Sequence, residues 1–324
     1  MHDGEIIEKI FSNTSSFNDN VLKIFHRQYS ENIIYRQWCR HMKVEKDRVN
    51  RPEKIPFLPI SFFKTHEITT GKFKAEVVFQ SSGTTKQKRS SHIVKDLSIY
   101  RKSFLTCFQR FYGDAGKYCI LALLPSYSPG SSLIMMVKEL IRLSGHSFSR
   151  FYAGNENDLS EVLRQLESQN QPAILIGVSF ALYDFAERFP QPLKSTLIME
   201  TGGMKGRKKE ITRQELHDFL KGRFELDQIH SEYGMTELLS QAYAKRDGRF
   251  ICPSWMKVLV RNEHDPLQVS EYGKGLLNII DLANIYSCSF IATDDVGEVF
   301  KDGSFEVNGR QDSSDLRGCS LLLA

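Results

Sequence analysis

The sequence lacks the patterns that mark secreted and membrane proteins. No window approaches the ~18 consecutive apolar residues of a membrane-spanning helix. The amino-terminal residues are polar and amphipathic, whereas a signal peptide needs a basic start and an apolar centre. We therefore expect a cytoplasmic protein with no membrane insertion.

Metal-binding cysteine pairs are also lacking. The six cysteines, at positions 39, 107, 119, 252, 288 and 319, include no C-x-x-C pair and no zinc-ligand spacing. This scatter predicts reduced thiols and no structural metal. We expect five of them to pack in the core and treat Cys319 separately below.

A strong charge of either sign is missing as well. The formal net charge is +4, and 41% hydrophobic and 25% charged residues are ordinary for a globular enzyme. Basic residues are spread along the chain without the aromatic-plus-basic pattern of an RNA-binding module. We therefore expect no nucleic-acid partner.

The 324 residues exceed the usual ~100–200 residues of one domain, which predicts a large α/β domain with a smaller part beside it. Residues 1–75 have helical apolar spacing that ends at three prolines, and we expect them to form a helical lead-in packed on the main domain. The main α/β domain is expected over residues 76–308. Residues 309–324 are expected to form a hinge remnant and tail.

Short apolar runs alternate with longer amphipathic ones between residues 118 and 220. This alternation predicts βαβ units around a mostly parallel sheet, with ligands at the carboxyl ends of the strands. The expected strands are Tyr118–Leu124, Ser147–Phe151, Ala173–Gly177 and Ser195–Glu200, and the expected helices are Leu133–Leu143, Asp158–Glu167, Phe180–Arg188 and Lys209–Leu220. Glycine-punctuated strands at Gly275–Asp281, Val296–Phe300 and Ser304–Val307 predict a small β subdomain.

The stretch Phe79–Arg89 reads FQSSGTTKQKR. Small residues let backbone N–H groups approach an anion, hydroxyls add donors, and basic side chains add charge, so the loop suits a polyphosphate. It lacks the second glycine of a Walker loop, which disfavours a P-loop kinase or GTPase. By itself the stretch is equally consistent with a polar surface loop.

Two further motifs follow the expected strands. TGGMKG, starting at Thr201, places a glycine pair at a strand-to-helix turn, where a flat ring could lie against bare backbone. YGMTE, residues 233–237, supplies an aromatic ring, a tight turn, a hydroxyl and a carboxylate, and Mg²⁺ prefers one or two carboxylates with phosphate oxygens. Each motif is weak alone, because a glycine turn need not bind a ligand.

Together, SSGTTKQKR, TGGMK and YGMTE resemble, in order, the phosphate loop, the adenine-side turn and the Tyr-Gly-x-Thr-Glu element of the adenylate-forming superfamily. Thr293-Asp294-Asp295 resembles its ribose-binding Thr-Gly-Asp, and the segment 309–312 resembles its Gly-Arg-x-Asp hinge. The resemblance implies the large N-terminal α/β domain of such an enzyme, with ATP and Mg²⁺ as cofactors. It implies activation of a carboxylic acid to an acyl-adenylate.

The resemblance also assigns roles. Glu237 would hold the metal, Arg310 would lie near the ribose or α-phosphate, and Tyr233 with Gly203 would enclose the adenine. The residues implied to bind ATP are Ser81, Ser82, Gly83, Thr84, Thr85, Gly202, Gly203, Met204, Tyr233, Gly234, Thr236, Asp295 and Asp312. Apolar residues that follow strand ends suit an acyl pocket but are equally consistent with the core: Tyr127, Leu133, Met135, Met136, Val178 and Phe180.

The chain departs from the superfamily pattern in two places. Lys86 stands where the phosphate loop normally has a glycine, and Lys88-Arg89 replaces its Pro-Lys. The chain also stops twelve residues after Asp312, so we expect the lysine-bearing C-terminal lid domain to be absent.

With a cysteine near its end, the chain resembles the LuxE-type acyl-protein synthetases. In that family the acyl group of a fatty acid passes from the adenylate to a cysteine near the C-terminus. The resemblance implies that Cys319 is the acceptor, that Arg317 favours its thiolate, and that an acyl-CoA reductase or acyl-carrier protein is a partner. Cys319 as a buried apolar residue is the alternative. An aryl-CoA ligase of the phenylacetate type and a non-catalytic nucleotide- or acyl-binding subunit also remain open.

Overall fold

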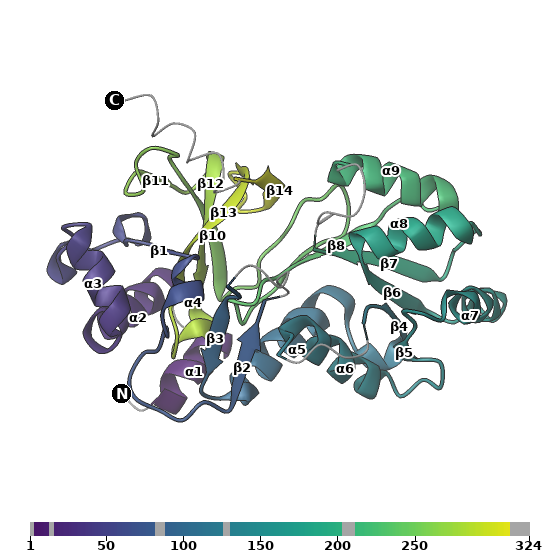
Figure 1. Cartoon of the computed structure of the whole chain (residues 1–324), viewed down its shortest axis with the longest axis horizontal. Coiled ribbons are helices and arrows are strands. Elements are labelled where there is room, and N and C mark those ends of the chain that lie inside the picture. The colour runs from purple at the N-terminus through teal and green to yellow at the C-terminus, as the bar shows by residue number, and fades with distance from the viewer. Residues whose placement is uncertain (1–2, 13–15, 82–87, 126–129, 203–210, 312–324) are drawn as a thin grey trace.

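The computed structural model describes residues 3–12, 16–81, 88–125, 130–202 and 211–311. Its frame consists of two sheets that stand beside each other (Figure 1). A hairpin of β2 (Val77–Gln80) and β3 (Ser91–Val94) lies at the lower centre of that view. The confirmed fold class is mixed α/β.

The first sheet has the strand order β5-β4-β6-β7-β8-β9 within the described residues. All neighbouring pairs are parallel except β8 with β9, which confirms the expected mostly parallel sheet. The strands are β4 (Cys119–Leu123), β5 (Arg150–Phe151), β6 (Ala173–Val178), β7 (Thr196–Thr201), β8 (His230–Tyr233) and β9 (Ala242–Ala244). The expected strand at Ser147–Phe151 is much shorter than its apolar run indicated.

Helices cover both faces of this sheet (Figure 1), and its central strands β4 and β6 are therefore buried on both sides. Alternate residues of β4 belong to different cores: Leu121 packs with the helices on one face, and Ile120 with the core on the other. The helices are α5 (Leu97–Tyr112), α6 (Ser132–Ser144), α7 (Glu156–Ser168), α8 (Ser179–Arg188) and α9 (Arg213–Phe224), with the one-turn η3 (Ala115–Lys117) after α5.

These helices match the sequence expectation closely for α6, α7 and α8, whose ends differ from it by at most two residues. The fourth expected helix was placed at Lys209–Leu220, but α9 begins at Arg213 and extends to Phe224. Thr212 caps α9 through a reciprocal pair of hydrogen bonds with Glu215, and this capping box sets the start of the helix.

The second sheet contains the strands that the sequence assigned to a small β subdomain, but it is larger than expected. Its order is β1-β13-β12-β10-β11, with β14 paired to β13, and every pair except β1 with β13 is antiparallel. The strands are β1 (Leu58–Pro59), β10 (Met256–Arg261), β11 (Val269–Ser270), β12 (Gly273–Asp281), β13 (Phe290–Val299) and β14 (Phe305–Arg310), with η4 (Leu282–Asn284) between β12 and β13.

Close contact between β13 and β14 depends on a glycine. A Cβ at Gly297 would lie 2.0 Å from the carbonyl oxygen of Glu306, at a point where the pairing register shifts. The expected strand began at 296, whereas β13 begins at Phe290. The polar residues Thr293, Asp294 and Asp295 concealed the strand, because a polar run reads as a loop.

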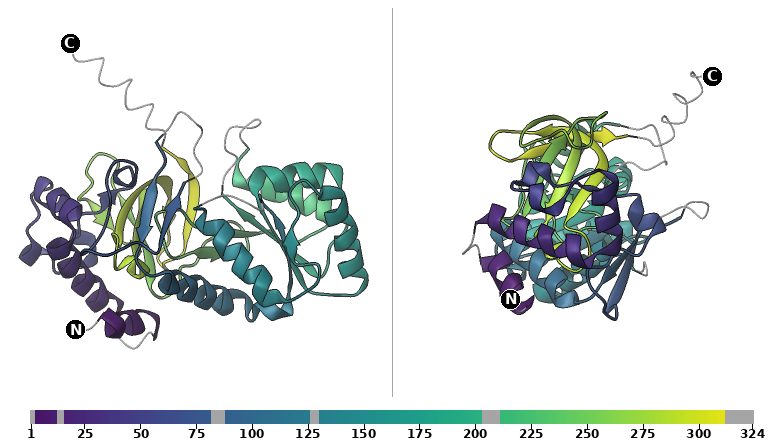
Figure 2. Two further views of the ribbon diagram at one scale, coloured as in Figure 1. Left: turned by 60° about the horizontal axis from the view of Figure 1, so that its bottom comes forward. Right: turned by 90° about the vertical axis from the view of Figure 1, so that its left-hand side faces the viewer.

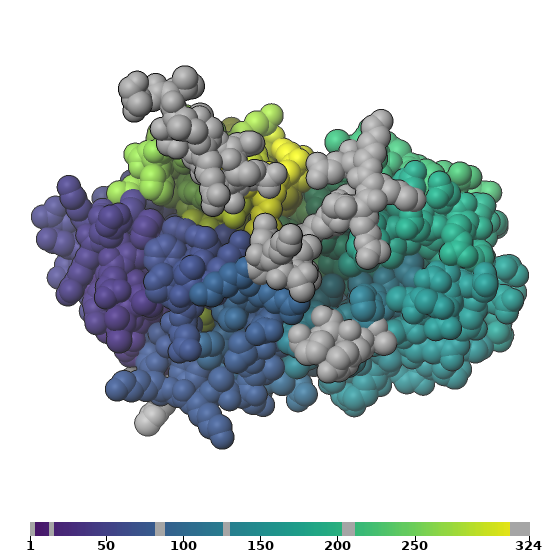
Figure 3. All heavy atoms as spheres, in the orientation of Figure 1, coloured from purple at the N-terminus to yellow at the C-terminus, as the bar shows by residue number. Residues whose placement is uncertain are grey.

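The N-terminal helices gather at one end of the molecule, outside the second sheet (Figures 2 and 3). They comprise α1 (Asp3–Ser12), α2 (Phe17–Glu31) and α3 (Ile33–His41), followed by η1 (Lys46–Arg48), η2 (Pro52–Lys54) and α4 (Phe62–Thr65). Gln28 is fully buried and donates from Nε2 to the carbonyl oxygen of Asn284 at 3.0 Å, so α2 is hydrogen-bonded to η4, the connection between β12 and β13. Within the described residues, no helix combines the length and hydropathy needed to cross a bilayer.

Candidate active site

The motifs of the sequence meet at the carboxyl ends of β7 and β8 and on the facing edge of the second sheet. The described residues include Ser81, Gly202, Tyr233, Gly234, Thr236, Glu237, Asp295 and Arg310. Eight other expected site residues lie outside the described part: Ser82, Gly83, Thr84, Thr85, Gly203, Met204, Asp312 and Cys319.

Tyr233 joins the two sheets. Its hydroxyl donates a 2.6 Å hydrogen bond to Oδ2 of Asp295, which is 62 residues further along the chain. The ring is 8% exposed and packs against Phe250 and Phe305, with ring centroids 5.7 and 5.4 Å away. The end of the YGMTE strand and the ribose-motif aspartate are thus held together.

Arg310 lies directly across from Asp295 in the β13–β14 ladder. Its guanidinium Nε is 3.9 Å from Oδ1 of Asp295, and its Nη2 is 3.7 Å from Oδ2 of Asp294. Burial raises the pKa of the Asp295 carboxyl, while the Tyr233 hydroxyl and the Arg310 charge act in the opposite direction. The Arg310 side chain is half exposed, so its donors can reach a ligand.

The phosphate-loop stretch closes at its base as a hairpin. The Ser81 N–H donates to the Ser90 carbonyl at 3.1 Å, and the Ser90 N–H donates to Oγ of Ser81 at 3.0 Å. Ser81 therefore fixes the two arms of the loop with its backbone N–H and its side-chain oxygen.

The second arm of this hairpin is joined to the YGMTE element. Nδ1 of the buried His92 lies 2.8 Å from the carbonyl oxygen of Thr236. Burial lowers the pKa of His92 to about 4, so the ring is neutral, and Nδ1 must carry the proton because a carbonyl only accepts. The hydroxyl of Ser90 bonds to the Glu237 carboxylate, which opposes the increase in its pKa caused by burial.

The loop after Glu237 rests on Asp281. The buried Asp281 carboxylate accepts from the backbone N–H groups of Leu239 and Ser240, at 2.8 and 3.0 Å, and from the Ser240 hydroxyl at 2.6 Å. Burial nevertheless raises its pKa to about 6. Asp281 thus fixes the backbone of Leu239 and Ser240, the segment that follows Glu237.

Glu232 is a second buried carboxyl close to the site. The Thr201 hydroxyl donates to its Oε2, across directly paired residues of β7 and β8. Burial, with a smaller contribution from the charge of Glu200, raises the pKa of Glu232 to about 7. A Cβ at Gly234 would lie 2.5 Å from Oε1 of Glu232, so the glycine makes room for the carboxyl.

Sequence reasoning missed His92, Asp281 and Glu232. Glu232 immediately precedes the YGMTE motif, so its position was a usable signal. For His92 and Asp281 the sequence carries no such signal, since their partners are 144 and 42 residues away.

The residues fit a nucleotide with a single divalent cation. Among the described side chains, no group of three or more His, Cys, Asp or Glu is arranged to hold a metal. Glu237 supplies one carboxylate that is 5% exposed, and Mg²⁺ usually takes one or two protein carboxylates together with phosphate oxygens. At Gly202, φ is +75°, and an added Cβ would meet no atom of the described residues within 4 Å.

The family comparison agrees with this geometry. The model of the acyl-protein synthetase family, LuxE, matches residues 11–324. The chain belongs to this LuxE family. No curated protein matches it by sequence.

Solved structures with a similar fold include adenylate-forming enzymes. O-succinylbenzoate coenzyme A synthetase (MenE) from Bacillus subtilis, in complex with AMP, has a TM-score of 0.51 at 17% identity, with 74% of this chain and 64% of that chain covered. The luciferase-like enzyme of the Zophobas morio mealworm has a TM-score of 0.50 at 19% identity, with 74% and 58% covered. MenE in complex with ATP and magnesium ion has a TM-score of 0.50 at 19% identity, with 72% and 49% covered. This LuxE-family chain therefore spans about half to two thirds of the length of these three proteins.

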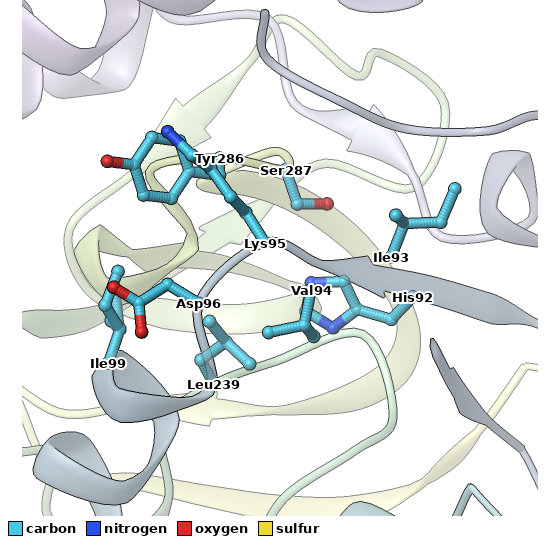
Figure 4. A pocket seen from close by; sticks show the side chains of 10 residues that line it. His92, Ile93, Val94, Lys95, Asp96, Ile99, Leu239, Tyr286 and Ser287 are labelled. Carbon is cyan, nitrogen blue, oxygen red and sulfur yellow. The ribbon is translucent and has the colours of Figure 1, made fainter. Parts of the chain in front are cut away.

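A small pocket lies behind the site in the LuxE-family chain (Figure 4). His92, on the β2–β3 hairpin, and Leu239, which follows Glu237, line this pocket. Tyr286 lines another side of it. The ammonium of Lys95 is 3.8 Å from the centroid of the Tyr286 ring. The walls are mostly apolar, so this pocket supports the loop and offers little to a nucleotide.

Of the residues expected to line an acyl pocket, Met136 is buried in the core under α6, and Leu133, Met135 and Val178 pack partly buried against the same core. Tyr127 lies outside the described residues. Their acyl-binding role stays a prediction.

Proposed function

We propose that this LuxE-family chain activates a carboxylic acid, a fatty acid in the first instance, with ATP and passes the acyl group to a protein thiol. The carboxylate attacks the α-phosphorus, the bond to pyrophosphate breaks, and an acyl-adenylate forms. A thiolate then attacks the acyl carbon, and AMP leaves. The observation that carries the proposal is the 2.6 Å hydrogen bond from Tyr233 to Asp295, which brings two nucleotide motifs into one site.

In this proposal Asp295 accepts hydrogen bonds from the ribose hydroxyls. The Tyr233 hydroxyl orients one carboxylate oxygen, leaving the other for the ligand. Arg310, across the ladder from Asp295, places its charge where the α-phosphate gains charge during attack. Such preorganised charge lowers the barrier without a covalent contribution from the protein.

Glu237 is the proposed magnesium ligand. Its burial raises its pKa, so a cation at the carboxylate compensates a charge that is otherwise costly to bury. Magnesium, when bound, neutralises the phosphate oxygens and aids departure of pyrophosphate. The hydrogen bond from Ser90 to Glu237 keeps this carboxylate next to the phosphate-loop hairpin.

Cys319 is the proposed acyl acceptor. All five cysteines of the described residues are free, and burial raises the pKa of each thiol, to about 12 for Cys252 and about 11 for Cys119. A thiol with a high pKa is a poor nucleophile near neutral pH. These five are therefore disfavoured, and Cys319 is the remaining cysteine of the sequence.

The acyl group would be handed on to an acyl-CoA reductase or an acyl-carrier protein. We place this chemistry in the cytoplasm, because the five described cysteines are unpaired and thiols stay reduced there.

ATP–pyrophosphate exchange over a panel of fatty and aromatic acids tests the activation step. We expect exchange that depends on both Mg²⁺ and a fatty acid, and loss of the Mg²⁺ response in Glu237→Gln. Absence of exchange with every acid, from a protein that is folded by circular dichroism, contradicts the activation step. Release of acyl-CoA on adding coenzyme A would instead identify a CoA ligase.

Covalent labelling with a radioactive fatty acid and ATP tests the acceptor. We expect Cys319→Ser to lose the hydroxylamine-sensitive label while exchange continues, because adenylation precedes thiol transfer. Cys252→Ser is the matched control and should keep the label. Label that survives in Cys319→Ser refutes the acceptor and leaves the activation step intact.

A further inference from the structure

A buried polar cluster lies immediately behind Gly202, on the α8–α9 face of the parallel sheet. At its centre is Glu200, on β7, whose side chain is 2% exposed. Nε of Arg213, the first residue of α9, donates to Oε1 of Glu200 at 2.8 Å. Burial by itself would raise the pKa of Glu200, but His217 and Arg213 outweigh it, so this carboxylate is ionised.

Arg213 reaches the second sheet as well. Its Nη1 donates to the carbonyl oxygen of Val307, on β14, at 2.8 Å. Its guanidinium carbon lies 5.1 Å from the ring centroid of Phe250. One side chain therefore joins β7 to β14, and the planar fork of arginine allows both hydrogen bonds at once.

The other end of the cluster holds the glycine turn. Oγ of Ser179 lies 3.1 Å from Oε2 of Glu200 and 3.1 Å from the carbonyl oxygen of Gly202, so its proton is shared between them. The backbone of Gly202 has φ +75°, a conformation that side-chain-bearing residues rarely adopt. A hydrogen bond to its carbonyl limits how this turn can move.

The strand that Arg213 contacts carries ligand-binding groups. Val307 is three residues before Arg310 on β14, and the ladder pairs Val307 with Gly297 and Arg310 with Asp295. The chain of contacts thus runs from the adenine-side turn through Ser179, Glu200 and Arg213 to the strands of the ribose and phosphate groups. Each contact in it is 3.1 Å or shorter.

We propose that Arg213 is a positioning residue for ATP. Through Glu200 and Ser179 it keeps the Gly202 turn at a fixed distance from Asp295 and Arg310, so that adenine and ribose are bound together. Arg213 itself touches no reacting atom. The proposal rests on ATP being the substrate, and it goes beyond the sequence motifs, which contain neither Arg213 nor Glu200.

Two variants test the proposal. Arg213→Lys keeps the charge but loses the fork, and the double variant Arg213→Met, Glu200→Gln removes both charges without leaving one unpaired. We expect the dissociation constants of ATP and AMP, measured by calorimetry, to rise about 10-fold in each variant, the usual order for losing a hydrogen bond to a charged group. KM for ATP should rise equally, while kcat and KM for the acid change less than about 2-fold.

Arg223→Lys is the matched control, since Arg223 lies on the same helix, is exposed, and contacts the Phe219 ring. It should bind ATP as the wild type does. Ser179→Ala should weaken ATP binding in the same direction as Arg213→Lys. A purely structural role would lower the melting temperature and change kcat and both KM values together, and would overturn the proposal.

Variants that are folded and bind ATP with wild-type affinity would also overturn it. Calorimetry separates this inference from the proposed function. A wild-type protein that binds ATP without any exchange contradicts the proposed function but leaves the Arg213 comparison valid. A wild-type protein that binds no nucleotide overturns both.

Discussion

The imidazole of His92 donates a hydrogen bond to the backbone carbonyl of Thr236 across 2.8 Å, joining two segments that are 144 residues apart. His92 belongs to the arm of the phosphate-loop hairpin, and Thr236 precedes the proposed metal ligand. The relative placement of the hairpin and the YGMTE segment therefore depends on a residue that belongs to neither motif.

Two substitutions of His92 distinguish the contribution of its ring packing from the contribution of its hydrogen bond. His92→Phe can keep the edge contacts with Phe63 and Phe79 but leaves the Thr236 carbonyl without a donor, at a cost of about 1–3 kcal/mol. We expect exchange activity to fall about 10-fold. His92→Asn, whose amide can donate from nearly the position of Nδ1, should retain more activity, and steady-state exchange kinetics compare the two. Equal losses in both variants would contradict a role for the hydrogen bond.

The same residue makes the protein sensitive to acid. The pKa of His92 falls from 6.5 unfolded to about 4 in the fold, so the unfolded chain binds the extra proton between these values. Its contribution to stability is complete above pH 6.5 and is lost as the pH falls to 4, by roughly 3 kcal/mol. Urea unfolding gives the free energy of unfolding of wild type and His92→Asn at several pH values. The difference between the two free energies should become smaller as the pH falls. A difference that is independent of pH would disprove this assignment.

Tyr233→Phe removes the donor to Asp295 while the ring packing remains. The Tyr233 hydroxyl opposes the raised pKa of Asp295, so its loss raises that pKa further. We expect KM for ATP to increase about 10-fold, with the acid limb of its pH profile displaced to higher pH. A profile unchanged in position would show that Asp295 does not bind the nucleotide as an ionised carboxylate.

Gly234→Ala should disrupt the site through Glu232. The new Cβ would lie 2.5 Å from Oε1 of the Glu232 carboxyl, so this side chain must leave its hydrogen bond with Thr201. We expect a loss of about 1–3 kcal/mol in the free energy of unfolding. Adding Glu232→Ala should restore part of it, because the clashing atom is gone. No coupling between the two substitutions in a double-mutant cycle would contradict the explanation.

Gly222→Ala serves as the control for that substitution. Gly222 is helical, in α9, and its added Cβ meets nothing within 4 Å. An alanine there should stabilise the protein by about 0.5–1 kcal/mol, since glycine loses more backbone entropy in a helix.

Glu232 should make stability fall as the pH rises. Its pKa is about 7 in the fold against 4.5 in the unfolded chain, so the folded protein holds the extra proton between these values. Stability from this group is complete below pH 4.5 and is lost as the pH rises to 7, on the order of 3 kcal/mol. The side chain of Glu232→Gln cannot ionise, so the stability of this variant relative to wild type should increase as the pH rises over this range. Parallel pH curves for the two proteins would refute the raised pKa.

The sequence predicted the limits of helices well, but it could not predict pairing between strands that are far apart in the chain. The limits of α6, α7 and α8 follow from apolar spacing, which depends on residues three or four apart. The start of β13 could not be read in this way, because Thr293 and Asp295 are polar and their strand pairing depends on β12 and β14. Apolar spacing indicates contacts only between residues that are close together in the chain.

The same limit applies within the site. The sequence alone determined the family resemblance, the nucleotide motifs and the alternation of strand and helix, because each is a pattern of residues that are close together in the chain. Only the tertiary structure decided that Tyr233 meets Asp295, that His92 holds Thr236 and that Arg213 joins β7 to β14. These contacts link residues far apart in the chain, and burial, which is the largest cause of the raised pKa of Glu232, exists only once the sheets have packed.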